Sequence, residues 1–279
     1  MKVDKFRTVI IYIIIILLGL VCLLPLLNIV AISFSSSAAV EGNMVGLIPV
    51  GFSTAAYEKI LEDSQFWHSF LISVERVVLT LIINFVLIVL MAYPLSKTNA
   101  QFRGRNIYAN LMIFAMLFNG GMIPTFLLVK SYGLLNTVWA LVLPGAVPIF
   151  NVILVMNFFA AVPKELEEAA FIDGANPLQV LTKIFIPISK PVLATVSLFS
   201  IVGSWNDFYS GLIYMSKAAY YPLMTYIQSL QINVEDLIKQ GNLSAVVDSA
   251  SLGNTNLNAA KIVVEVIPLL LIYPLLQRY

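Results

Sequence analysis

Six long apolar stretches recur along the chain, separated by polar segments. A helix needs roughly 17–25 apolar residues to cross a hydrocarbon core of ~30 Å. A segment in lipid must satisfy its own backbone hydrogen bonds, and these stretches lack the alternation of β-barrel strands. The pattern therefore predicts six transmembrane helices, over residues 9–32, 70–93, 107–129, 138–158, 192–214 and 259–276.

The first stretch has one feature of a signal peptide, because Lys2, Lys5 and Arg7 precede it and small residues follow at 35–39. Its length of about 24 residues exceeds the 7–15 residues of a signal-peptide apolar region. We therefore expect this stretch to remain as the first transmembrane helix.

The distribution of basic residues predicts the orientation of the chain, because lysine and arginine collect on the cytoplasmic side. One set of loops holds Lys2, Lys5, Arg7, Lys97, Arg103, Arg105, Lys164, Lys183, Lys190 and Arg278. The other holds Lys59, Lys130, Lys217, Lys239 and Lys261, while Arg76 lies within a stretch. We expect both termini in the cytoplasm and segments 33–69 and 215–258 outside. No internal repeat is visible, so residues 1–279 are interpreted as one domain.

Composition supports a membrane protein. Hydrophobic residues make up 59% of the chain and charged residues 11%, and the mean hydropathy is +0.91. Soluble domains carry about 25% charged residues, so a soluble enzyme or a disulfide-stapled secreted domain is excluded. The net charge of +1 offers no basic surface for nucleic acid. The single cysteine, Cys22, lies in an apolar run and gives no information about redox compartment.

The cytoplasmic loop between the fourth and fifth stretches, about residues 160–190, begins with a helical pattern. Strong helix formers fill residues 164–173, and Pro163 suits the first helical position. Gly174 then suits the left-handed residue that ends a helix.

The same loop continues with signals for a second helix. Asn176 and Pro177 suit an N-cap and a first-turn proline, and residues 178–186 follow before Pro187 ends the helix. Its expected apolar face consists of Leu178, Leu181 and Phe185. The loop is thus predicted to form a helix, a glycine turn and a helix.

This loop reproduces the EAA motif of the membrane subunits of ABC importers. The matching residues are Glu168, Ala169, Ala170, Gly174, Ile184 and Pro187, with Ile186 where leucine is usual. Residues 119–130 and 133–145 resemble carbohydrate-importer permeases of the oligosaccharide and polysaccharide branch, and Trp205-Asn206-Asp207-Phe208 is similar to their fifth-span motif. The resemblance implies an all-α integral membrane protein with six transmembrane helices and a cytoplasmic helix-turn-helix coupling loop.

The resemblance also implies partners. These are cytoplasmic ATPase subunits in two copies, a second, homologous permease, an extracytoplasmic sugar-binding protein and a saccharide substrate, at the cell membrane. In such importers Glu168 would meet a basic residue of the ATPase, and Gly174 would set the bend of the loop. The chain has no phosphate-loop motif and no metal-ligand spacing. We therefore expect no enzyme activity and no cofactor here, with ATP and Mg on the partner ATPases.

The fifth stretch carries a polar stripe at helical spacing. It comprises Ser197, Ser200, Ser204, Asp207 and Gly211. A lipid-facing carboxylate costs roughly 2.5–3.5 kcal/mol, so Asp207 is expected to point inward. The predicted saccharide path consists of Ser197, Ser200, Ser204, Trp205, Asn206, Asp207 and Tyr209, with Trp205 and Tyr209 as stacking surfaces. Two alternatives remain: close helix packing through small residues and a structural pair between Asp207 and Arg76.

Other polar residues within the stretches suggest a different class of function. Glu75 is expected to pair away from its neighbour Arg76, Lys261 is expected to pair with Glu265 one turn away, and His68 suits the membrane interface. The alternative function is that the chain forms half of an ion-coupled secondary transporter, in which carboxylates within the spans would bind the coupling ion. We find no clustered nucleophile, base or metal site for an enzyme.

Overall fold

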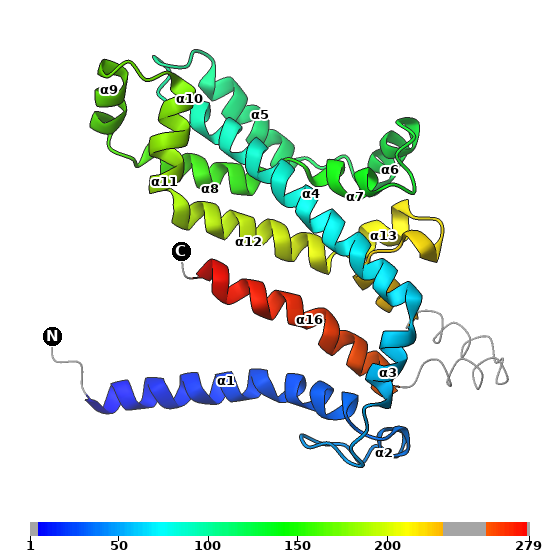
Figure 1. The fold of residues 1–279 in the computed structure, drawn as a ribbon. Coiled ribbons are helices and arrows are strands. Elements are labelled where there is room, and N and C mark those ends of the chain that lie inside the picture. The colour runs from blue at the N-terminus through cyan, green and yellow to red at the C-terminus, as the bar shows by residue number, and fades with distance from the viewer. Residues whose placement is uncertain (1–4, 231–254, 278–279) are drawn as a thin grey trace. The chain divides into compact units, whose positions relative to one another are not determined.

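The computed structural model describes residues 5–230 and 255–277, and every regular element in these ranges is a helix (Figure 1). The remaining residues include Lys2, Lys239, Arg278 and part of the predicted outer segment 215–258, so these predictions lie outside the described residues. The chain divides into two compact units, Met1–Trp67 with Ile227–Pro268 and His68–Tyr226 with Leu269–Tyr279.

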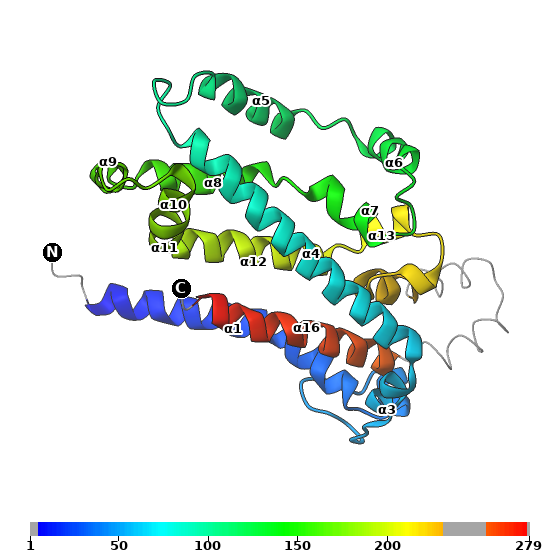
Figure 2. The same cartoon turned by 45° about the horizontal axis from the view of Figure 1, so that its top comes forward.

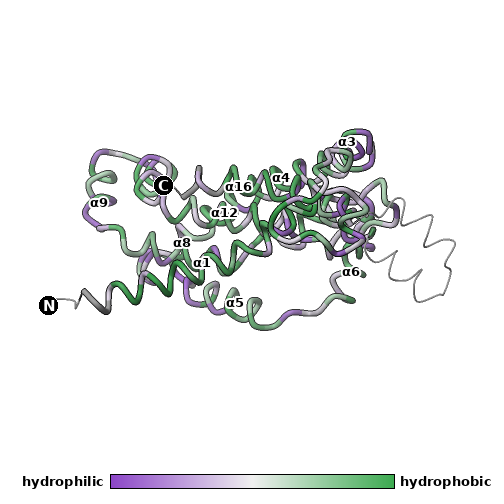
Figure 3. The backbone as a smooth tube through the Cα atoms, turned by 90° about the horizontal axis from the view of Figure 1, so that it is seen from below, coloured by the Kyte–Doolittle hydropathy of each residue, from purple (hydrophilic) through white to green (hydrophobic). Residues whose placement is uncertain are grey.

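The first unit begins with α1 (Lys5–Ser33), which Figure 3 colours as hydrophobic over nearly its whole length. Its apolar side chains are exposed, as expected for a helix that faces lipid. The further elements are α2 (Ser37–Glu41), α3 (Ala55–Glu62), the start of α4 (Ser64–Leu95) and much of α16 (Thr255–Gln277).

Polar contacts attach the start of α16 within this unit. The buried Asn256 amide donates to the carbonyl oxygen of Ser35 (3.3 Å). Lys261, for which the sequence predicted a pair with Glu265, forms a salt bridge to Asp63 (3.0 Å). Asp63 also accepts a hydrogen bond from the Phe66 N–H (3.0 Å) and so caps the first turn of α4.

The second unit contains most of α4 and the helices up to Tyr226. They are α5 (Arg105–Leu117), α6 (Met122–Ser131), α7 (Val138–Val142) with η1 (Leu143–Gly145), α8 (Ile149–Ala160), α9 (Lys164–Ile172), α10 (Pro177–Val180), η2 (Leu181–Phe185), α11 (Ile186–Ile188), α12 (Lys190–Asn206), α13 (Tyr209–Tyr214) and η3 (Ala218–Tyr220). In Figures 1 and 2, α4 crosses α8 and α12. Its buried residues share one apolar core with those two helices and with η2.

Three of the predicted spans are not continuous helices. In the described residues, α1, α4 and α16 are each long and apolar enough to cross a bilayer, and the count rises to six if each of three bent helix pairs is one span. The bends are 110° between α5 and α6, 48° between α7 with η1 and α8, and 84° between Pro177–Ile188 and α12. The predicted stretches 107–129 and 138–158 are thus each broken.

Local sequence explains these two breaks. Gly121 adopts a φ of 90°, and its N–H donates to the side-chain oxygen of Asn119 (2.9 Å) before α6 begins. Pro144 and Pro148 interrupt the second stretch, because proline lacks an N–H and disfavours a helical conformation in the residue before it.

The fifth predicted stretch, 192–214, is also divided. Asp207 is extended, with φ −80° and ψ 96°, and it separates α12 from α13. The stripe from Ser197 to Gly211 therefore does not follow one helix, and its description as a single helical face is wrong beyond Ser204.

Candidate functional site

A polar cavity of about 260 Å³ lies within the second unit. Residues of α4, of the segment from α7 to α8, and of α12 and α13 line it. Its polar lining residues are Arg76, Thr80, Asn84, Asn151, Ser200, Ser204, Asp207, Ser210 and Tyr214. It thus combines part of the predicted saccharide path with polar residues that the sequence analysis did not select.

Arg76 and Asp207 form an ion pair at the cavity wall. Arg76 Nη2 donates to Asp207 Oδ2 (2.5 Å), and Nη1 donates to the Asp207 main-chain oxygen (2.9 Å). The Arg76 side chain is 4% exposed and that of Asp207 is 30% exposed. Asp207 Oδ1 accepts from the N–H of Ser210 (3.1 Å), so the same carboxylate also holds the first turn of α13. The pairing alternative for Asp207 is therefore found in the structure, and Asp207 also borders the cavity.

The serines of α12 participate in hydrogen bonds with their own helix and with α4. Ser200 Oγ donates to the Val196 carbonyl (3.0 Å) and accepts from Asn84 Nδ2 (3.2 Å). Ser204 Oγ donates to the Ser200 carbonyl (2.6 Å). Both hydroxyls retain acceptor capacity toward the cavity.

Several buried polar atoms around the cavity lack a protein partner. Among the described residues they include Arg76 Nε, Thr80 Oγ1 and Asn84 Oδ1. A buried polar group without a hydrogen bond costs about 1–3 kcal/mol, so these atoms favour water or a polar ligand in the cavity. The volume is large enough for several waters at about 30 Å³ each.

The other predicted path residues do not line this cavity. Trp205 is buried and packs edge-on against Phe70, with ring centroids 5.8 Å apart. Tyr209 is exposed, and its hydroxyl contacts the sulfur of Met122 (2.9 Å). Ser197 is half-buried and Asn206 is exposed. Neither ring lines this cavity, so a saccharide bound in it would not stack on Trp205 or Tyr209 as predicted.

The lining residues Thr80, Asn84, Asn151 and Ser210 are not among the predicted path residues. A signal for two of them was present, because Arg76, Thr80 and Asn84 recur every four residues and so occupy one face of α4. Asn151 gave no such signal, because it stands alone in an apolar run.

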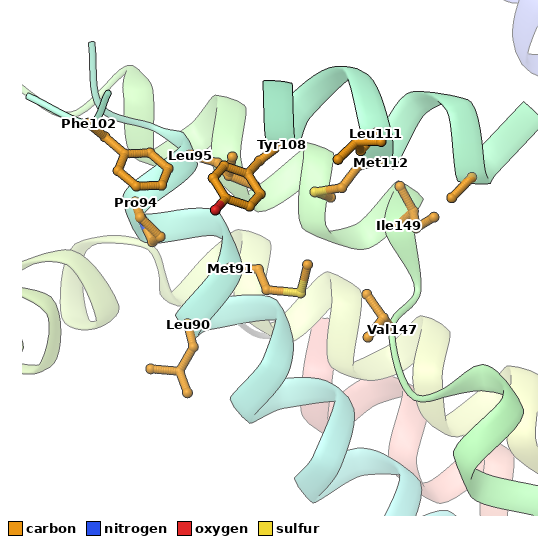
Figure 4. A pocket seen from close by; sticks show the side chains of 11 residues that line it. Leu90, Met91, Pro94, Leu95, Phe102, Tyr108, Leu111, Met112, Val147 and Ile149 are labelled. Atoms are coloured by element: carbon orange, nitrogen blue, oxygen red, sulfur yellow. The ribbon is translucent and has the colours of Figure 1, made fainter. Parts of the chain in front are cut away.

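A larger cavity of about 490 Å³ lies between α4, α5 and the segment before α8 (Figure 4). Its lining consists of Leu90, Met91, Pro94, Leu95, Phe102, Tyr108, Leu111, Met112, Ala115, Val147 and Ile149. These side chains offer little hydrogen bonding, so the smaller polar cavity is the better candidate for a hydroxyl-rich ligand.

The EAA residues lie on α9 and the elements that follow it. Helix α9 starts at Lys164 behind Pro163 and ends at Ile172, which shifts each predicted boundary by one residue. Glu168 and Ala169 are exposed, and Ala170 packs partly against the core. Gly174 has a φ of 82°, and a Cβ at this position would have no atom within 4 Å, so its backbone conformation, and not crowding, requires glycine.

The second loop helix is longer and less regular than predicted. Asn176 and Gln179 form a reciprocal capping box, and Pro177 occupies the first turn, as expected. The helix then passes through a π-helical turn at η2, which includes Ile184, and continues past Pro187 to Ile188. Leu181 and Phe185 are buried, whereas Leu178 is exposed.

Glu167 of the loop forms an ion pair with Lys97, which follows α4, and this pair was not predicted. Lys97 Nζ lies 2.7 Å from each carboxylate oxygen of Glu167, the neighbour of Glu168. Burial lowers the pKa of the Lys97 ammonium from its usual value, and the hydrogen bond and charge of Glu167 oppose that shift. Seventy residues separate the partners along the chain, so no local spacing could have indicated the pair.

Comparison with known proteins gives the family. The profile described as "Binding-protein-dependent transport system inner membrane component" matches residues 78–279. Protein LplC of Bacillus subtilis is 39% identical, over 94% of this chain and 87% of its own length. The polygalacturonan/rhamnogalacturonan transport system permease protein YtcP of the same organism is 38% identical, over 99% and 95%.

A solved structure agrees with these relatives. It is that of a bacterial ABC transporter involved in the import of the acidic polysaccharide alginate. The match has a TM-score of 0.86 and 32% identity and covers 100% of this chain and 98% of the other. The chain therefore belongs to the binding-protein-dependent transport system inner membrane components, the multi-pass permease subunits of ABC importers, whose ATP site lies on partner ATPases.

Proposed function

We propose that this chain moves a saccharide, in the form of an oligosaccharide or a polysaccharide fragment, across the cell membrane by alternating access. The transport functions of YtcP and of the alginate importer support a carbohydrate substrate. In this proposal α5 with α6, α7 with α8, and α12 with α13 each form one span, and together with α1, α4 and α16 they give six spans with both termini in the cytoplasm. Two ATPase copies, a second homologous permease and an extracytoplasmic sugar-binding protein complete the importer.

The observation that carries the proposal is the polar cavity with unpaired buried atoms. Saccharide hydroxyls donate and accept hydrogen bonds, and the cavity offers an orphan donor at Arg76 Nε and acceptor capacity at Thr80, Asn84, Ser200 and Ser204. Because Arg76 offsets the charge of Asp207, the wall remains close to neutral. A near-neutral site that binds through hydrogen bonds suits a substrate that must also be released from it.

The exposed face of α9 is the proposed contact with the ATPase. Glu168 provides the charge, and the exposed side chains of Leu166, Phe171 and Ile172 provide apolar contact. Gly174 sets the bend, while Ala169, Ala170, Ile184 and Pro187 shape the loop. A cavity of about 480 Å³ beside Gly174, Ala170 and Ile184 would admit a side chain of the partner.

Reconstitution of the importer tests the proposal. The chain, its partner permease and the ATPases are placed in proteoliposomes with the binding protein outside, and uptake of labelled oligogalacturonides is compared with that of neutral oligosaccharides. We expect uptake of at least one saccharide only with ATP inside. Saccharide uptake driven by a sodium or proton gradient without ATP would favour an ion-coupled transporter and contradict the proposal.

A further inference from the structure

Helix α9 is fixed to the rest of its unit mainly through one charged side chain. Glu167 is the only residue of α9 that is buried. Its carboxylate binds Lys97, which follows the end of α4, and the two side chains are 10% and 12% exposed. Beyond this pair, Ala170 of α9 packs partly against the apolar core. The ion pair is thus the main polar link between α9 and the span α4.

Aromatic rings surround this link. Lys97 Nζ lies 4.1 Å from the ring centroid of Tyr93 and 4.3 Å from that of Phe185, within the range of cation–π attraction. The Tyr93 hydroxyl donates to Glu167 (3.4 Å). Phe185 in turn packs edge-on against Phe159 of α8, with centroids 5.4 Å apart. Rings of α4 and η2 therefore contact the lysine that binds α9, and α8 supports the ring of Phe185.

Glu167 and Glu168 lie on different sides of α9. Successive residues of a helix point about 100° apart, and here Glu167 is buried while Glu168 is exposed. The Glu167 carboxylate faces Lys97 at the end of α4, whereas the Glu168 carboxylate lies on the side where an ATPase would dock.

We propose that Lys97 and Glu167 are positioning residues for energy coupling, which transmit the movement of α9 to the span α4. This inference rests on the proposed function, because it assigns to α9 the contact with the ATPase. Without a buried attachment, α9 would tilt independently of α4 when the ATPase moves it. The short, two-oxygen ion pair and its aromatic surroundings resist that tilt and move α4 with α9.

The experiment uses the complete importer and needs no identified saccharide. Cys22 is replaced by serine, and Gly203→Cys introduces a reporter in the polar cavity at a position where a Cβ has no atom within 4 Å. A membrane-impermeant maleimide then reports cavity accessibility with and without Mg-ATP. The double variant Lys97→Met/Glu167→Met keeps side-chain volume and leaves no buried charge unpaired. We expect it to copurify with the ATPases but to show an ATP-dependent change in labelling about tenfold smaller, within the usual range of coupling between distant sites.

Two further variants make the result specific. Lys97→Arg keeps the charge and the contact with the rings and is expected to retain the ATP-dependent change. Glu62→Gln is the matched control, because it removes an exposed carboxylate from α3, which has no part in the proposed ATPase contact, and it is expected to behave like the importer with the native glutamate.

The outcomes separate this inference from the proposed function. An unaltered ATP-dependent change in the double variant would overturn the inference alone. Failure of the double variant to copurify would assign the pair to assembly and would also overturn it. Absence of any ATP-dependent change in the importer with the native Lys97–Glu167 pair would contradict the proposed function, and the inference with it.

Discussion

Arg76 of α4 binds Asp207 at the point where α12 ends, through both the carboxylate and the main-chain oxygen of Asp207. The partners are 131 residues apart along the chain. Because the main-chain oxygen lies within a helix break, the guanidinium supplies a donor where the regular helical hydrogen bonds stop. The pair thus fixes the break and borders the polar cavity, so structural and transport roles for Asp207 coexist.

Removal of the charge at Asp207 should affect both roles. In Asp207→Asn the buried Arg76 loses its counter-ion, and we expect a stability loss of roughly 1–3 kcal/mol, between the values for exposed and buried pairs. Saccharide uptake should also fall. Thermal unfolding of the purified importer and uptake in proteoliposomes measure the two effects.

The double variant Arg76→Met/Asp207→Asn separates these effects. It removes the unpaired charge, so the unfolding temperature should recover while uptake stays low. Recovery of uptake together with stability would show that the pair is only structural. Wild-type behaviour of the single variant in both measurements would remove Asp207 from either role.

A close contact inside the second unit predicts a second stability effect. A Cβ at Gly211 would overlap Thr225 Oγ1, and Thr225 is fully buried with its hydroxyl bonded to the Phe208 carbonyl (2.8 Å). We expect Gly211→Ala to destabilise the permease by roughly 1–3 kcal/mol through overpacking. The matched control is Gly19→Ala in α1, where nothing lies within 4 Å. An unfolding temperature of Gly211→Ala equal to that of the control would show that Thr225 moves without cost.

The apolar pattern predicted where helices occur better than where they break. The stretches 9–32, 70–93 and 259–276 each fall within one helix, although Pro25 lies inside the first and Pro268 and Pro274 lie inside the last. Asp207 carries one local signal, because an aspartate can hold the first turn of a following helix, as it does here through the Ser210 N–H. Its pairing with Arg76, which is distant in sequence, has no local signal. In the same way, the EAA motif indicates a role for Glu168, whereas the burial of Glu167 and its pairing with Lys97 have no signal in the sequence.

The predicted orientation is open to direct labelling. In a chain with Cys22 replaced, single cysteines are introduced at the exposed positions Gln179 and Lys217. In intact cells we expect an impermeant maleimide to label position 217 and not position 179, because the basic loops face the cytoplasm. Permeabilised cells provide the control, in which both positions should react. Labelling of position 179 from outside would reverse the orientation.

The last prediction concerns the bend of the loop at Gly174. Its φ of 82° disfavours any residue with a Cβ, at a cost of about 1 kcal/mol, and a branched side chain is worse. We expect Gly174→Val to redirect the second loop helix, reduce ATPase copurification and abolish uptake, with Glu168→Ala weakening the same association. Gly133→Val is the matched control, because Gly133 has a φ of 67°, offers a Cβ open space to 4 Å and lies after α6, away from the loop. If Gly133→Val loses ATPase association to the same extent as Gly174→Val, the effect reflects general backbone strain. If Gly174→Val or Glu168→Ala transports at the wild-type rate, α9 does not transmit the movement of the ATPase.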